Sequence, residues 1–212
     1  MEGILDMLQS DFGKRIISGV AASTGNDSEK TGNVLTMAMP VLMKAMQRNV
    51  STPEGAEGLM GALSGKHDGS ILDNVEHLFN GGVNDDIVQD GGNILGHVLG
   101  NKQSGVEQVI SQKSGVDAGG VGNILKVAAP ILMAVLGKKT RQNNVNNSSD
   151  LGGLLGGLLG GSSAKKEQGF LEQILDADGD GSVVDDVAGM LLGGGNKKSG
   201  GLGGLLGGLF GK

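Results

Sequence analysis

The apolar residues of the chain gather in helical patterns, and the two most apolar segments carry nearly the same sequence. Residues 31–46 read TGNVLTMAMPVLMKAM, and residues 121–136 read VGNILKVAAPILMAVL, at a constant offset of 90 positions. A helix that is apolar on every face is buried, so each segment predicts a central core helix. The repetition indicates an internal duplication of a helical unit. It extends backwards without a gap to two earlier pairs, Gly25 with Gly115 and Asp27 with Asp117.

A proline stands inside each repeated segment, at Pro40 and at Pro130. A proline in a helix interior removes one backbone hydrogen bond and clashes with the preceding turn, at a cost of about 3 kcal/mol. We therefore expect two kinked or restarted core helices that form the paired centre of one helical body. The alternative is a loop at each proline, which would divide each segment into two short helices.

The remaining patterns of residues 1–137 are also helical. STPEGAEGLMGAL (51–63) begins with a Ser/Thr cap, a proline in the first turn and acidic residues after it, which is typical of a helix start. ILGHVLG (94–100) and GVEQVISQKSG (105–115) show helical spacing that ends at glycines. Few stretches alternate as a strand would, so the sequence predicts an all-α fold.

The same part of the chain resembles a bacterial family. The stretches RNVSTPEGAEGLMGAL, HDGSILDNV, DGGNILGHVLG and ILKVAAPILMAVLG are similar to the domain of unknown function 937, a family of helical proteins related to the YidB-like proteins. The terminal GGLGGLLGGLFGK is also similar to the ends of such proteins. The resemblance covers roughly residues 1–137 and implies a helical fold and a bacterial source. It implies no activity, so no functional residue is transferred.

Glycine divides the chain into two parts of different composition. Of the 42 glycines among 212 residues, 20 lie in residues 151–212. The Asn- and Ser-rich stretch GKKTRQNNVNNSSD precedes this part and is typical of a linker. We therefore expect a duplicated helical domain in residues 1–137, a polar linker in 138–150 and a Gly/Leu-rich tail in 151–212.

Composition excludes several classes of function. The chain has no Cys, which excludes disulfides, thiol catalysis and Cys-ligated metal sites. Its formal net charge is −6, with no Trp or Tyr, so we expect no binding of nucleic acid. We recognise no secretory signal and no apolar run long enough to span a membrane, and we expect a cytoplasmic protein.

The tail contains an aspartate-rich loop, DADGDGSVVDDV (176–187), that resembles an EF-hand. Carboxylates at loop positions 1, 3 and 5 converge on a hard cation such as Ca²⁺, and a glycine at position 6 permits the sharp turn. Position 12 is Val187 in place of the usual acidic residue, so we expect weak binding, at about 10⁻⁴–10⁻³ M. The alternative is an acidic helix cap with a solvated turn. The candidate metal ligands are Asp176, Asp178, Asp180, Ser182, Asp185 and Asp186.

Two Gly/Leu segments, LGGLLGGLLGG (151–161) and LGGLLGGLFGK (202–212), share one register. As helices, each would carry one apolar stripe opposite a glycine face. Each helical glycine costs about 1 kcal/mol relative to alanine, so we expect helices only when the stripes dock on a partner. The partner could be the helical body, another copy, another protein or a membrane surface, and the alternative is a flexible linker and tail. The candidate contact residues are Leu151, Leu154, Leu155, Leu158, Leu202, Leu205, Leu206, Leu209 and Phe210.

The sequence shows no recognisable catalytic arrangement. His67, His77 and His97 are isolated from one another, and we interpret them as surface or helix-face residues. Our hypothesis is a non-enzymatic protein that acts by self-association or partner binding, with a weak Ca²⁺ site. One alternative is a peripheral membrane protein anchored by the leucine stripes. Another is an enzyme with a polar cleft between the two repeats.

Overall fold

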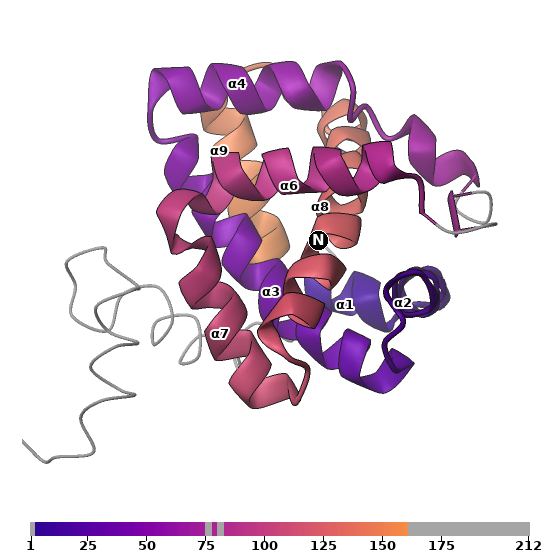
Figure 1. Cartoon of the computed structure of the whole chain (residues 1–212). Helices are drawn as coiled ribbons and strands as arrows, with labels where there is room; N and C mark the ends of the chain where they lie inside the picture. Colours follow the sequence, from indigo (N-terminus) through magenta and orange to yellow (C-terminus); the bar gives the residue numbers. More distant parts are fainter. Residues whose placement is uncertain (1–2, 75–77, 80–82, 161–212) are drawn as a thin grey trace, which may run out of the picture.

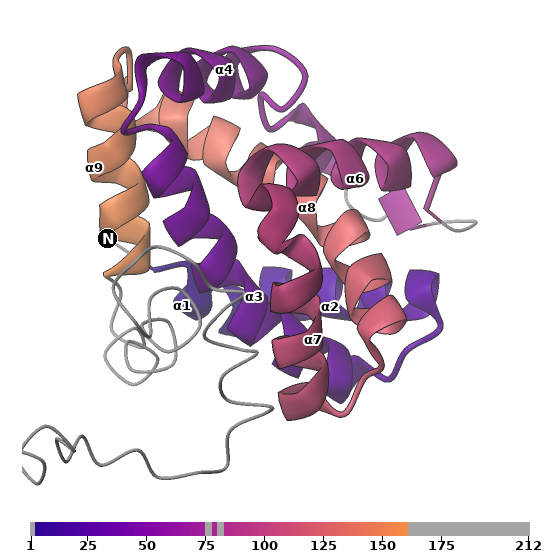
Figure 2. The same ribbon diagram turned by 60° about the vertical axis from the view of Figure 1, so that its left-hand side comes forward.

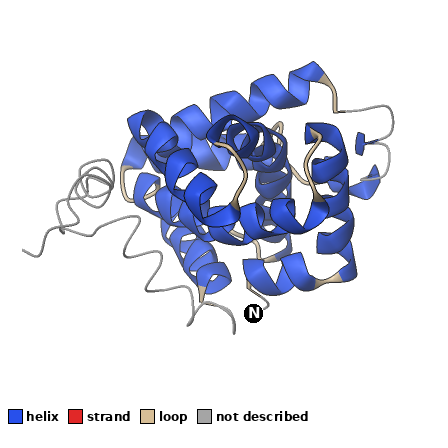
Figure 3. Ribbon diagram, turned by 60° about the horizontal axis from the view of Figure 1, so that its bottom comes forward, coloured by secondary structure: helices blue, strands red, loops and turns tan. Residues whose placement is uncertain are grey.

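The computed structural model describes residues 3–74, 78–79 and 83–160. Every regular element within these ranges is a helix (Figure 3), which confirms the all-α prediction. The first half contains α1 (Ile4–Gln9), α2 (Asp11–Thr24), α3 (Ser28–Asn49), α4 (Pro53–Ser64) and the 3₁₀ helix η1 (Ser70–Asn74). The second contains α6 (Asp85–Leu99), the 3₁₀ helix η2 (Gly100–Lys102), α7 (Gln103–Ser114), α8 (Ala118–Gln142) and α9 (Ser148–Leu159).

Helices α3 and α8 form the centre of the fold, and they carry the two repeated segments. Half of the residues of α3 and most of those of α8 are buried, because the other helices cover them (Figures 1 and 2). Helix α8 is also long and apolar enough to cross a membrane by composition alone, but 78% of its most apolar window is buried in this fold. That burial is typical of the core helix of a globular domain.

The turns that lead into α3 and α8 have the same local geometry. Gly25 ends α2 with φ 67° and Gly115 ends α7 with φ 69°, a left-handed conformation that favours glycine. Asp27 then caps α3, and its Oδ1 accepts hydrogen bonds from the backbone N–H groups of Glu29 and Lys30. Asp117 caps α8 in the same way. The Gly and Asp positions shared by the two repeats therefore start the two core helices.

The core helices continue through both prolines. Pro40 lies inside α3 and Pro130 inside α8, and the helical backbone runs on to Asn49 and Gln142. The structure therefore contradicts the alternative of a loop at each proline. Dense packing on all sides compensates for the backbone hydrogen bond that each proline removes. A kink at these prolines stays a prediction.

Residues expected to form a linker are partly helical. Helix α8 extends to Gln142, because Lys139, Thr140 and Arg141 continue its last turns. Helix α9 begins at Ser148, since the Asn147 side chain accepts a hydrogen bond from the backbone N–H of Asp150. Polar residues that indicate a linker are thus also the residues that cap a helix. Within the predicted linker 138–150, residues 138–142 and 148–150 are helical, and the domain boundaries stay a prediction.

Candidate functional site

A cavity of about 610 Å³ lies between α4 and α6, with parts of α3 and α8 behind it. The two outer helices run near each other at one end of the molecule (Figure 1). Aliphatic and thioether side chains form much of its wall: Met46, Leu59, Ala62, Ile94, Val98 and Met133. The polar lining consists of Arg48, Asn49, Thr52, Glu54, His67, Asp90, Asn93 and His97.

One end of the cavity contains His67 and Asp90. The His67 side chain is 9% exposed and that of Asp90 is 14% exposed. Nε2 of His67 lies 3.5 Å from Oδ2 of Asp90, and Nζ of Lys66 lies 2.8 Å from Oδ1 of the same carboxylate. Asp90 is therefore paired with a lysine whose side chain is 68% exposed.

The environment of His67 favours its neutral form. Burial lowers the pKa of the imidazole, because a charged ring would lose its hydration. The carboxylate of Asp90 opposes this change by raising the pKa, and the charge of Lys66 lowers it again. The net pKa of His67 is lower than its ordinary value. At neutral pH the imidazole can thus both donate and accept a hydrogen bond.

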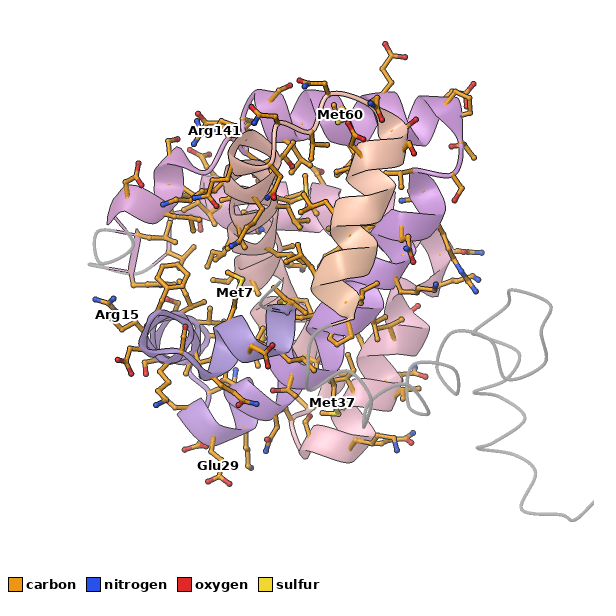
Figure 4. The ribbon with its side chains drawn as sticks, turned by 180° about the vertical axis from the view of Figure 1, so that it is seen from behind. Met7, Arg15, Glu29, Met37, Met60 and Arg141 are labelled. Atoms are coloured by element: carbon orange, nitrogen blue, oxygen red, sulfur yellow. The ribbon has the colours of Figure 1, made fainter. Side chains whose placement is uncertain are left out.

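Close backbone packing fixes the position of His67. The residue follows α4, and its backbone N–H donates to the carbonyl oxygen of Ala62 at 3.0 Å. Its own carbonyl oxygen lies against Gly137 of α8, where a Cβ atom would collide with it. The next residue, Asp68, accepts a hydrogen bond from Arg141 (labelled in Figure 4) at 3.2 Å. The segment after α4 is therefore held on the end of α8.

The other end of the cavity is formed by the start of α4 and the end of α6. Thr52 caps α4, and its hydroxyl accepts a hydrogen bond from the backbone N–H of Gly55. Nδ2 of Asn49 donates to the carbonyl oxygen of His97 at 3.1 Å, which connects α3 to α6. Polar groups therefore stand at both ends of a mainly aliphatic space.

Chemically, this arrangement suits the binding of a molecule with an aliphatic body and polar ends. The imidazole–carboxylate pair could also accept a proton from such a molecule. The cavity contacts both core helices, but it lies between α4 and α6 and its wall is mainly aliphatic, so it differs from the polar cleft between the two repeats that the enzyme alternative expects. A cleft by itself defines no reaction, and the expectation of a non-enzymatic protein stays a prediction.

The first leucine stripe lies on the body of its own chain. Leu151, Leu154, Leu155 and Leu158 of α9 are buried, at 4% exposure or less, in the common hydrophobic core. Helix α9 lies along α3 and reaches α4 (Figure 2). The groove formed by α3 and α4 is called the α9 groove below. Of the partners left open by the sequence, the helical body is the one that this stripe contacts here.

The other predicted site residues lie outside the described residues. These are the metal-ligand candidates of 176–187, namely Asp176, Asp178, Asp180, Ser182, Asp185 and Asp186, and the second stripe, namely Leu202, Leu205, Leu206, Leu209 and Phe210. Among the described residues, no group of three or more His, Cys, Asp or Glu side chains could hold a metal ion. The Ca²⁺ site stays a prediction.

The interpretation of the histidines is wrong for His67. His67 is buried and next to Asp90, whereas His97 is exposed and borders the cavity. His77 lies outside the described residues. The signal that the sequence does offer is Asp90 itself, four residues before Ile94 on the apolar stripe of α6, which indicates that Asp90 has a partner but not which residue it is. A carboxylate at such a position needs a partner, because burial of an unpaired charge is costly.

The fold and the cavity define an all-α domain that is built around two proline-containing core helices. The chain belongs to a family described as a bacterial protein of unknown function (DUF937), whose model matches residues 6–139. This confirms the family resemblance seen in the sequence. A comparison with curated proteins and another with solved structures each found no match for the chain.

Proposed function

We propose that the chain is a non-enzymatic, partner-binding protein whose second leucine stripe, residues 202–210, docks as a helix on another protein. The observation that supports this is the seating of α9, in which the sequence LGGLLGGLL forms a helix and buries four leucines. The second stripe differs from residues 151–159 at one position, Phe210 in place of Leu159. A nearly identical sequence has the same requirement for an apolar groove.

Competition for the α9 groove favours a foreign partner over a second copy. Helix α9 follows α8 after a connection of residues 143–147, so it meets its groove at an effective concentration of about millimolar. The second stripe of another copy would have to displace it from micromolar solution. When the second stripe of one copy enters the α9 groove of another copy, it displaces the α9 that was there. The exchange therefore buries one leucine stripe and exposes another, and the number of grooves stays the same. A protein with an unoccupied aliphatic groove between two helices fits the second stripe better.

Sedimentation velocity of the full-length chain tests this choice of partner. We expect a monomer at all concentrations up to about 100 µM, because weak exchange cannot overcome millimolar effective concentration. A concentration-dependent dimer that disappears in Leu205→Ser/Leu206→Ser/Leu209→Ser would instead assign the stripe to self-association. The matched control is Gly203→Ala/Gly204→Ala/Gly208→Ala, which keeps the leucine stripe and changes the glycine face.

We also propose that the aspartate loop at 176–187 binds Ca²⁺ weakly. The support is the spacing of Asp176, Asp178 and Asp180 with Gly181. Calorimetric titration of the full-length chain should give a Kd of about 10⁻⁴–10⁻³ M. No binding up to 10 mM Ca²⁺, or binding that persists in Asp176→Asn/Asp178→Asn/Asp180→Asn, would contradict the site.

We also propose that the helical body arose by an internal duplication, and that α3 bends at Pro40 and α8 at Pro130. The constant offset between the repeats and the matching Gly and Asp turns before α3 and α8 support a common origin of α2–α3 and α7–α8. The proline inside each core helix supports a bend there.

A membrane-surface role is the alternative for the second stripe. Flotation of the full-length chain with liposomes, lost in the triple leucine variant, would favour it.

A further inference from the structure

We propose that the cavity between α4 and α6 binds a small, uncharged amphipathic molecule, with an aliphatic chain of about 10 Å and a hydroxyl or amide group at its end. This site is separate from the leucine stripes and does not depend on the proposed docking function.

The size and wall of the cavity define the body of the ligand. A volume of about 610 Å³ falls in the range of about 300–1,000 Å³ that is usual for small-molecule pockets. No Phe ring lines it, and the chain has no Tyr or Trp that could stack on a planar ligand. Met46 of α3 and Met133 of α8 contribute flexible thioether side chains, which adapt to an irregular aliphatic shape.

The geometry of α6 defines the length of the ligand. Asp90 stands at one polar end of the cavity and His97 at the other, with Ile94 between them on the same helix. Seven residues of α-helix rise by about 10 Å. An extended chain of this length can therefore contact the aliphatic wall while its end reaches His67 and Asp90.

The charges at the end of the cavity that contains His67 and Asp90 favour an uncharged head group. Lys66 already neutralises Asp90 at 2.8 Å, so a ligand ammonium would compete with a lysine that is in place. A ligand carboxylate would face the Asp90 carboxylate and a buried, neutral imidazole. A hydroxyl or amide group avoids both penalties, because it donates and accepts hydrogen bonds without carrying charge.

The contact between the imidazole of His67 and the carboxylate of Asp90 is long. Nε2 of His67 lies 3.5 Å from Oδ2 of Asp90, beyond the usual hydrogen-bond distance of about 2.7–3.2 Å. A polar group that is nine-tenths buried gains stability when a partner reaches it. A ligand hydroxyl at this end of the cavity would supply that partner.

Methyl NMR of the full-length chain, labelled at its methionine methyl groups, tests the proposal with 1-octanol as the probe. We expect saturable shifts of Met46 and Met133, which line the cavity. Met7, Met37 and Met60, labelled in Figure 4, lie on α1, α3 and α4 outside the lining and should not shift. Octanoate and octylamine should bind at least about tenfold more weakly, which corresponds to 1.4 kcal/mol. Absence of saturable shifts, equal shifts of all methionines, or equal binding of a charged probe would overturn the proposal.

Two glycines of α4 provide a matched pair of variants. Gly58 lines the cavity, and an added Cβ there meets no atom within 4 Å. Gly61 has the same open space but does not line the cavity. Gly58→Leu should therefore occupy part of the cavity and weaken octanol binding about tenfold, whereas Gly61→Leu should leave it unchanged. Both changes raise helix propensity, so both chains should fold. Unchanged binding by Gly58→Leu would overturn the proposal.

Discussion

Nε2 of His67 lies 3.5 Å from Oδ2 of Asp90, at the end of a cavity whose walls are mostly aliphatic. These two residues come from separate parts of the sequence, the segment after α4 and the middle of α6. Among the described residues, His67 is the only buried histidine. It lies next to a carboxylate, Asp90, whose charge Lys66 already neutralises. The properties of this pair lead to the first two predictions.

Stability should decrease as the pH falls below about 6.5, the ordinary pKa of histidine. Burial lowers the pKa of His67 in the folded state, so the unfolded chain binds the extra proton first. The neutral His67 ring contributes fully to the free energy of unfolding when the pH is above the pKa of His67 in the unfolded chain. This contribution is lost progressively as the pH falls towards the lower pKa of His67 in the folded chain. Urea unfolding between pH 7.5 and 5.5 should show this loss, and His67→Gln should reduce it. The exposed His97→Gln is the control, and an equal pH dependence in His67→Gln would contradict the assignment.

Asp90→Asn should lower the pKa of His67 still further. The carboxylate raises this pKa, whereas burial and Lys66 lower it, so its removal leaves the two lowering effects without opposition. An NMR titration of the His67 ring protons in the wild type and the variant measures the change directly. A pKa that stays constant or rises in the variant would show that the two side chains do not interact.

Gly91→Ala should destabilise the fold by about 1–3 kcal/mol. Helix α6 packs so closely on α8 at this position that a Cβ atom would collide with the backbone carbonyl group of Lys126. Backbone atoms cannot move aside as the end of a flexible side chain can. The neighbouring Gly92 has open space, so Gly92→Ala should instead stabilise the chain by about 0.5–1 kcal/mol. Urea midpoints of the two variants measure the contrast, and similar midpoints would contradict this packing.

Leu155→Ala should cost about 2–5 kcal/mol, because the side chain is fully buried where α9 contacts the body. Gly153→Ala, on the open side of the same helix, serves as the control and should not destabilise the chain. Urea unfolding measures both. If Leu155→Ala costs less than about 0.5 kcal/mol, α9 does not belong to the stable core and is no guide to the second stripe.

The sequence predicted the core helices better than it predicted the site. Segments that are apolar on all faces have one favourable location in a globular fold, so 31–46 and 121–136 indicated α3 and α8 directly. The start of α4 at Pro53 followed from local signals, the cap at Thr52 and the proline itself. The start of α9 was missed because Asn and Ser indicate both linkers and helix caps.

The pairing of His67 with Asp90 could not be predicted from local pattern. It depends on how closely α6 and the segment after α4 approach α8, and glycines decide that distance. Gly91 and Gly137 allow backbone contacts that any side chain would prevent. In the sequence these two residues stand among many other glycines, and nothing in their neighbours indicates which of them lie at helix contacts.

The central claim is that residues 202–210 dock on another protein as α9 docks on its own body. A photoreactive amino acid at Leu206 of the full-length chain, irradiated in living bacteria, tests it most directly. We expect one prominent cross-linked partner protein, which is lost in Leu205→Ser/Leu209→Ser and retained in Gly203→Ala/Gly204→Ala. Cross-links confined to the chain itself or to lipid, or a partner that persists without the leucines, would contradict the claim.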